Sequence, residues 1–382
     1  MGRQEQTNHL FSNRDLRILL VPLIVEQILN SLMGTADSIM VSNVGSAAIS
    51  AVSLVDSINI LVIQAFYALA AGGTIVCSQY IGQKDKKNAE ESARQLSFVV
   101  ACISSAVMAV CLLTRGPLLR LIFGSVEADV MEAAQIYFFY TALSFPFIAL
   151  YDAGSSIYRA QGNTRLPMTI AVVSNGLNIA GNAVLIWGFH LGVAGAAIAT
   201  CLGYCVPSIV GLVYFTKNRT GSLYFVPFNF DGATLAAACG NGSSEMVSNI
   251  ANAITTFVFN TLFMRYRGED GVAAITIAMY FQFVFTAVYF GFSRGVAPVI
   301  SYKFGEKNIP QLRHIFRICM TFVLACSLGT YVLSWLTLEP ALTLFTPRGS
   351  SVYEIAMHGF PMYAVSFLLM GTSIFASSLF TA

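Results

Sequence analysis

The chain has 382 residues, of which 56% are apolar and only 10% are charged, and its formal net charge is +2. A soluble domain typically has about 25% charged residues, so this composition excludes an ordinary soluble protein and indicates an integral membrane protein. The small net charge and the lack of a basic stripe with interleaved aromatics argue against a nucleic-acid partner. The four histidines are scattered, and no phosphate loop, metal-binding histidine pair or nucleophile elbow occurs in the sequence, so we expect neither an enzyme nor a cofactor.

Ten apolar segments are long enough to cross a bilayer as helices, for which about 20 residues are needed. In chain order they cover 16–44, 47–81, 96–113, 131–158, 166–189, 193–215, 234–263, 272–300, 315–338 and 352–382. None of these runs alternates over about 10 residues, as the strands of a membrane barrel do. The sequence therefore predicts an all-α integral membrane protein.

The basic residues lie mainly on one side of this predicted topology. With the N-terminus in the cytoplasm, fifteen of the 21 lysines and arginines, Arg159 among them, belong to that side, five lie opposite, and Arg294 lies inside a helix. An excess of basic residues on the cytoplasmic side is the rule for membrane proteins. We therefore expect a multi-pass protein of the plasma membrane with a cytoplasmic N-terminus.

The first apolar segment carries two carboxylates, Glu26 and Asp37. Their separation of eleven positions returns them to within roughly 20° of one direction on a helix, so both would line one stripe. A carboxylate near the bilayer centre costs on the order of 2.5–3.5 kcal/mol, and such residues usually mark an ion or substrate path. The alternatives are that Glu26 is solvated at a membrane boundary and that Asp37 only hydrogen-bonds a neighbouring helix.

An internal repeat is found when the second half of the chain is shifted over the first by 223 residues. Glycines and prolines match at this offset: Gly45 with Gly268, Gly72 with Gly295, Gly82 with Gly305 and Pro117 with Pro340. Because the first unit has six helices, the second has the same orientation, as in secondary transporters built from parallel repeats. In this register Asp37 lies opposite Asn260, and Glu26 has its best match in Glu245, one helical turn away.

The repeat predicts two helical lobes around a central cleft. Residues 1–217 would form a six-helix lobe, 218–233 a cytoplasmic linker and 234–382 a second lobe of four helices. Counterparts of the fifth and sixth helices are missing from the second lobe, so we expect a truncated product or a fragment. The alternative is that ten helices are the complete design.

Four motifs in order carry a family resemblance: DSIMVSNVG at 37–45, QYIGQK at 79–84, RAQGNTRLPM at 159–168 and GVAGAAIAT at 192–200. With them the chain resembles the multidrug and toxic compound extrusion (MATE) transporters over essentially its whole length. The resemblance implies an antiporter that exports amphipathic drugs or toxic organic cations and is driven by inward Na⁺ or H⁺. It also implies two six-helix lobes around a central cleft, with the coupling cation bound by carboxylates inside a lobe.

The resemblance assigns ion coupling to Asp37 on the first helix. On the fifth helix the family has an Asn followed four residues later by an Asp, whereas this chain has Asn178 and Asn182. Neither can ionise, so a proton site would depend on Asp37 alone, while both can offer carbonyl oxygens to Na⁺ on one helical face. Interhelical hydrogen bonding is the alternative role for the two amides.

A second-lobe site is implied by Glu245, which matches an acid on the seventh helix of some family members, with Glu26 as its repeat counterpart. Those members also carry an acid within the tenth helix. The corresponding segment here has only Glu354, close to its start. Compared with those family members, the second-lobe site of this chain therefore lacks the acid of the tenth helix.

Weaker candidates for the substrate cleft are Asp56 and the aromatic residues Phe281, Phe285 and Tyr289, because aromatic faces bind flat cations. Packing within the bundle or against lipid is the alternative. A flippase for lipid-linked oligosaccharides, from the same superfamily, would need a more basic cleft, whereas Arg294 is the one basic residue in the interior of a predicted helix, away from its ends. An inactive remnant is a third hypothesis. We expect a monomer in the bilayer whose partners are small molecules.

Overall fold

The computed structural model describes residues 21–27, 29–30, 33, 37, 40–41, 44–123, 127–217 and 232–382, with some side chains inside these ranges excepted. All regular structure in these ranges is helical. The elements are α2 at Ser46–Gly82, α3 at Lys86–Phe123, α4 at Ala128–Ala160, α5 at Arg165–Asn182, α6 at Gly192–Lys217, α7 at Gly232–Gly305, α8 at Ile309–Phe345 and α9 at Ser351–Thr381. A π-helical segment, η2 at Ala183–Gly188, continues α5.

Eight helices of the described part are long and apolar enough to cross a membrane. They coincide with the predicted second to sixth and eighth to tenth segments, which confirms the all-α membrane fold. Most of the first segment, 16–44, lies outside the described residues, although 21–27 are helical. Large apolar side chains remain exposed, such as Leu113 at 85% and Leu121 at 83%, as a surface in contact with lipid tails requires.

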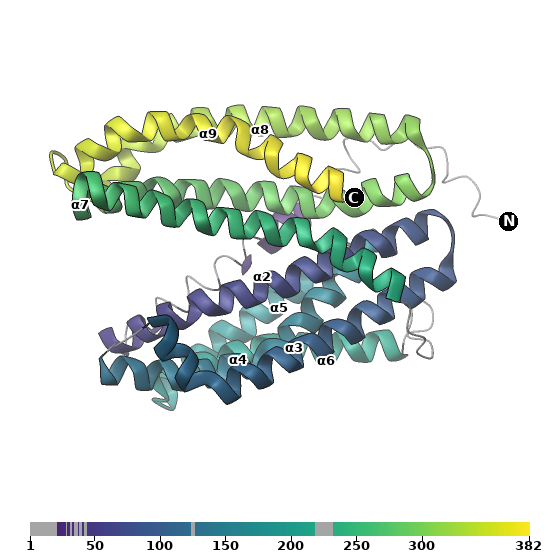
Figure 1. Ribbon diagram of the computed structural model, residues 1–382, viewed down its shortest axis with the longest axis horizontal. Coiled ribbons are helices and arrows are strands. Elements are labelled where there is room, and N and C mark those ends of the chain that lie inside the picture. Colours follow the sequence, from purple (N-terminus) through teal and green to yellow (C-terminus); the bar gives the residue numbers. More distant parts are fainter. Residues whose placement is uncertain are drawn as a thin grey trace.

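The long element α7 contains two predicted helices, 234–263 and 272–300. Between them Gly268 adopts φ 64° and ψ −152°, a conformation that is essentially restricted to glycine. The chain reverses direction there, so the two parts of α7 run side by side in opposite directions (Figure 1). The helices α8 and α9 are capped at their N-termini. The side chains of Asn308 and Ser350 accept hydrogen bonds from main-chain N–H groups in the first turns of α8 and α9, respectively.

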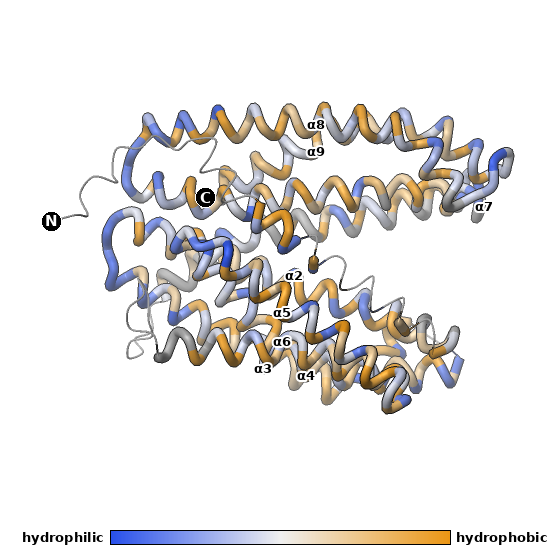
Figure 2. Tube along the Cα trace, turned by 180° about the vertical axis from the view of Figure 1, so that it is seen from behind, coloured by the Kyte–Doolittle hydropathy of each residue, from blue (hydrophilic) through white to orange (hydrophobic). Residues whose placement is uncertain are grey.

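The helices form two bundles, one of α2 to α6 and the other of α7 to α9 (Figure 1). The first has one apolar core, in which Val41, Phe138 and Phe145 are fully buried. The second has two core clusters, one around Phe367 and one around Phe292. Hydrophilic residues gather toward the ends of the bundles and apolar residues dominate their middle (Figure 2). Two lobes are thus observed, while the bounds 1–217, 218–233 and 234–382 stay a prediction, since most of the linker lies outside the described residues.

The bundles approach each other closely where α2 and α7 end. A Cβ built on Gly82 would lie 2.1 Å from the carbonyl oxygen of Tyr302, and one built on Gly305 would lie 2.2 Å from the carbonyl oxygen of Gln79. Each residue of the second contact is related to one of the first by the offset of 223. The same main-chain contact is therefore made twice, and only glycine allows it.

Candidate functional site

A polar cluster inside the first bundle centres on Asp37. This carboxylate is 7% exposed, and the side chains of Asn178 and Asn182 on α5 are fully buried beside it. The two amides share one face of α5 because they are four residues apart. The structure therefore brings together the three residues for which the sequence predicted a coupling site.

Hydrogen bonds link this cluster across three segments of the chain. Asn182 donates from Nδ2 to Oδ1 of Asp37, and Asn178 donates from Nδ2 to the Thr200 hydroxyl at 3.1 Å. The Thr200 hydroxyl lies 3.4 Å from Oδ2 of Asp37 and 3.0 Å from the Ala196 carbonyl, so its single proton can serve one of them at a time. Thr200, on α6, was not predicted, although it ends the GVAGAAIAT motif.

The oxygen atoms of this cluster suit a hard cation. The Oδ1 atom of Asn182 is buried without a hydrogen-bond partner among the described residues, an arrangement that costs free energy unless a cation or donor binds there. The carboxylate of Asp37 and the oxygens of Asn178 and Thr200 complete an all-oxygen set, the type that binds Na⁺ in transporters. In the described part of the chain no three His, Cys, Asp or Glu residues form a group that could hold a metal ion.

Asp56 forms a neighbouring polar cluster on α2. Its Oδ1 accepts hydrogen bonds from the Tyr137 hydroxyl at 3.2 Å and from Nδ2 of Asn59 at 3.4 Å. It is close enough to Asp37 for the two carboxylates to interact electrostatically. The structure thus places Asp56 beside the predicted ion site rather than in the central cleft.

The predicted aromatic cleft residues lie in the core of the second bundle. Phe285 is 7% exposed and its ring centroid is 5.2 Å from that of Phe367. Tyr289 is 1% exposed, with its hydroxyl 3.1 Å from that of Thr330. Phe281 packs edge-on against a neighbouring phenylalanine at 4.9 Å. None of the three is among the residues that line the cavity between the bundles.

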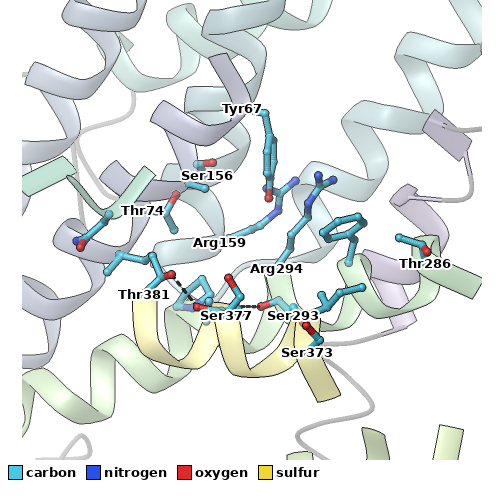
Figure 3. Close-up of a pocket in the computed structure, with 18 of the residues that line it drawn as sticks. Tyr67, Thr74, Ser156, Arg159, Thr286, Ser293, Arg294, Ser373, Ser377 and Thr381 are labelled. Carbon is cyan, nitrogen blue, oxygen red and sulfur yellow. Dashed lines mark hydrogen bonds between the residues drawn. The ribbon is translucent and has the colours of Figure 1, made fainter. Parts of the chain in front are cut away.

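That cavity has a volume of about 320 Å³ and is lined by residues of α2, α4, α7 and α9 (Figure 3). Hydroxyl groups line much of it, including those of Thr74, Ser156, Ser293, Ser373 and Ser377. Two arginines, Arg159 and Arg294, also line it, and both extend toward Tyr67 (Figure 3). The cleft is therefore more basic than the sequence predicted.

Arg159 was assigned to the loops on the cytoplasmic side, but the structure places it in the last turn of α4 with its side chain at the cavity. It donates from Nη2 to Oε1 of Glu26 in an ion pair whose side chains are 9% and 5% exposed. Buried ionised groups are normally paired, and this partner explains how Glu26 tolerates burial. Glu26 thus bonds to α4 near the cavity, whereas Asp37 bonds to α5 and α6.

Arg294 connects the two bundles. From α7 it donates from Nη1 to Oε1 of Gln27 at 2.6 Å. Its guanidinium carbon lies 3.7 Å from the ring centroid of Tyr67 on α2 and 5.5 Å from that of Phe290. The predicted second-lobe acid, Glu245, has its side chain outside the described residues, so that part of the site stays a prediction.

The MatE family model matches residues 22–184 and 246–382, which is well over half of the chain. The chain belongs to the MatE family. It is 33% identical over 218 residues to YisQ, an uncharacterized transporter of Bacillus subtilis, and the match covers 56% of this chain and 46% of YisQ. It is 24% identical over 364 residues to the multidrug export protein MepA of Staphylococcus haemolyticus, covering 92% of this chain and 78% of MepA.

The fold comparison agrees with this family assignment. An outward-facing multidrug resistance MATE transporter of the MOP superfamily superposes with a TM-score of 0.88 at 21% identity, covering 96% of this chain and 82% of that chain. At this identity the likeness concerns the fold alone. The MatE family consists of membrane transporters, so the predicted family, the helical fold and the multi-pass membrane location are confirmed.

Proposed function

We propose that this MatE protein is a cation-coupled efflux antiporter of the plasma membrane that exports amphipathic small molecules. The observation that carries the proposal is a polar cluster inside one bundle, separate from the cavity between the bundles, in which Thr200 lies against the buried side chains of Asp37, Asn178 and Asn182. Two separate sites, one for the ion and one for the cargo, are coupled when their occupancies bias the same conformational equilibrium.

The coupling ion, Na⁺ or H⁺, would supply the positive charge that neutralises Asp37. The chain's own residues hold the carboxylate in place: Asn182 from α5 donates to it, and Thr200 from α6 lies against its second oxygen. These bonds tie the first helix to α5 and α6. A change in ion occupancy at Asp37 therefore acts on the packing of three helices of the first lobe.

Alternating access requires that the lobes separate at one end and meet at the other. The paired contacts of Gly82 and Gly305 hold the lobes together at the end where α2 and α7 terminate. With a cytoplasmic N-terminus this is the cytoplasmic end, and contact between the lobes at that end is what an outward-facing state requires.

The size of the central cavity favours an exporter of small molecules over the alternative, a flippase for lipid-linked oligosaccharides. Its volume of about 320 Å³ is within the range of about 300–1,000 Å³ that is typical of sites for drug-sized ligands. The name of MepA as a multidrug export protein supports the same choice.

The experiment that tests this function is accumulation of ethidium or norfloxacin in cells that express the chain, with the Na⁺ and pH gradients varied separately. We expect one gradient to drive export and Asp37→Asn to abolish that drive. Asp129→Asn, at an exposed position in the first turn of α4, is the matched control and should leave export unchanged. Equal export with and without both gradients, or an Asp37→Asn variant that behaves like the parent, would refute ion coupling at this site.

A further inference from the structure

Asp56 on α2 is a second carboxylate inside the first bundle, beside the cluster of Asp37. Its Oδ1 accepts hydrogen bonds from the Tyr137 hydroxyl on α4 and from Nδ2 of Asn59. The carboxylates of Asp37 and Asp56 interact electrostatically. When both are ionised, one Na⁺ at Asp37 leaves a net negative charge between these helices, and buried charges are normally paired.

Basic side chains of the first lobe do not pair with Asp56. Its inner helices contain no lysine, arginine or histidine over the ranges 18–83, 128–158, 166–189 and 191–216. On α3, Arg115 lies over the ring of Phe139, 5.2 Å from its centroid. Because Phe139 is two positions from Tyr137, it points to roughly the opposite side of α4. The ion pairs within the described ranges do not include Asp56, so a bound cation is left to compensate its charge.

Asn59 supplies a second oxygen beside this carboxylate. Its side chain is 6% exposed, and its Oδ1 is buried without a hydrogen-bond partner among the described residues. A buried acceptor of this kind costs free energy unless a donor or a cation binds it. The Oδ1 of Asn182 beside Asp37 is in the same situation. The Tyr137 hydroxyl donates its proton to Asp56 and keeps lone pairs for a cation. Carboxylate, amide and hydroxyl oxygens thus meet, a set that hard cations prefer.

The second lobe shows that the fold does not require polar groups at these positions. At the offset of 223, Asp56 corresponds to Met279 and Tyr137 to Phe360. Phe360 is 3% exposed in an apolar core, against which Met279 packs. Two apolar side chains therefore fill the equivalent place. The polar group around Asp56 is specific to the lobe that holds Asp37, which favours ion binding over packing as its role.

We propose that Asp56 and Asn59, with the Tyr137 hydroxyl, form a second Na⁺ site, so that the first lobe binds two cations. This inference deepens the ion coupling proposed above and rests on it. Two bound Na⁺ neutralise both carboxylates and remove the repulsion between them. Because the free energies of two inward ion movements add, a second coupled Na⁺ raises the driving force for export of each cargo molecule.

Binding of radioactive Na⁺ to the purified full chain in detergent micelles counts the sites. We expect two Na⁺ per chain in the parent, and one in Asp56→Asn and in Asp37→Asn. Asn59→Leu keeps the neighbouring carboxylate but removes the amide oxygen, and should weaken one of the two sites about tenfold. Asp129→Asn, the same change at an exposed position of α4, is the matched control and should still bind two.

Thermal unfolding of each variant shows that it is folded. One Na⁺ or none per chain in the parent would overturn the proposal. It would also be overturned if Asp56→Asn still bound two Na⁺, or if both sites of Asn59→Leu kept the affinity of the parent.

Export of ethidium from liposomes that contain the purified chain, under imposed Na⁺ and pH gradients, separates this inference from the function it rests on. Two bound Na⁺ without gradient-driven export would support the second site and refute the antiporter. Sodium-driven export with one bound Na⁺, or proton-driven export with none, would overturn the second site and leave the antiporter standing. Two bound Na⁺, with export that depends less steeply on Na⁺ concentration in Asp56→Asn than in the parent, would support both.

Discussion

The guanidinium of Arg294 stacks on the ring of Tyr67, with its central carbon 3.7 Å from the ring centroid, and so joins α7 of one bundle to α2 of the other. A desolvated contact of this kind contributes about 2 kcal/mol, and an exposed one about 0.5–1 kcal/mol. We expect Tyr67→Phe to retain the stacking and Tyr67→Leu to lower the free energy of unfolding by about 1 kcal/mol. A double-mutant cycle with Arg294→Gln, followed by denaturant unfolding in micelles, measures the coupling directly. Strictly additive effects would show that the contact contributes nothing.

Thr200 should tune the affinity for the coupling ion. Thr200→Val keeps the shape of the side chain but removes the hydroxyl that lies 3.4 Å from Asp37 and accepts from Asn178. We expect the Na⁺ concentration for half-maximal export to rise about tenfold, because the cluster loses one oxygen that can bind the ion. Thr200→Ser should restore the parent value.

The control for this experiment is Thr114→Val on α3, where an exposed threonine makes a comparable bond to the carbonyl four residues earlier. It should leave the ion dependence unchanged. If Thr200→Val behaves like Thr114→Val, the hydroxyl has no part in ion binding.

Breaking the ion pair between Glu26 and Arg159 should destabilise the protein strongly, because the remaining partner is left as a buried, unpaired charge. Glu26→Gln is expected to lower the free energy of unfolding by about 3–5 kcal/mol, whereas the double change with Arg159→Gln should cost less than the sum. Glu339→Gln provides the control, because Glu339 and its partner Arg348 have side chains that are 55% and 70% exposed, respectively. Exposed ion pairs contribute about 0–1 kcal/mol to stability. Equal effects of the two glutamate substitutions would contradict the burial argument.

The contact between α2 and α7 should be sensitive to one added methyl group. Gly82→Ala would place a Cβ 2.1 Å from the carbonyl oxygen of Tyr302, so the main chains must move apart. We expect faster amide hydrogen exchange at 79–86 and 302–309, measured by mass spectrometry. Gly329→Ala on α8, where an added Cβ meets nothing within 4 Å, should leave this exchange unchanged. If these amides exchange equally slowly in Gly82→Ala and Gly329→Ala, the added methyl group is accommodated without separating α2 from α7.

The membrane helices could be predicted from the sequence because a bilayer requires long apolar runs. Their ends could not, since the polar first turns of a helix look like a loop in such a pattern. The third predicted segment starts at 96, but α3 begins at Lys86 and includes Glu90 and Arg94. Polar helical ends of this kind protrude beyond the apolar run.

The polar cluster around Asp37 was predictable where its members share one helix or a family motif, as Asp37, Asn178 and Asn182 do. Thr200 and Arg159 were missed because their roles depend on contacts between distant parts of the chain. The distribution of basic residues along the sequence assigned Arg159 to a cytoplasmic loop. Its ion pair with Glu26, 133 positions away, could be found only from the structure. Aromatic residues such as Phe285 look the same in sequence whether they line a cleft or fill a core.

The duplicated contact of Gly82 and Gly305 has the form of an isologous interface, in which the same patch of two subunits meets itself across a two-fold axis. The aromatic residues beside Arg294 obey the same relation, because Phe290 follows Tyr67 by 223 positions. The counterpart of Arg294 itself is Ala71, which also lines the cavity. A homodimer of either half would carry two such arginines or none, whereas a single chain with two halves can place one positive charge between a symmetric pair of rings.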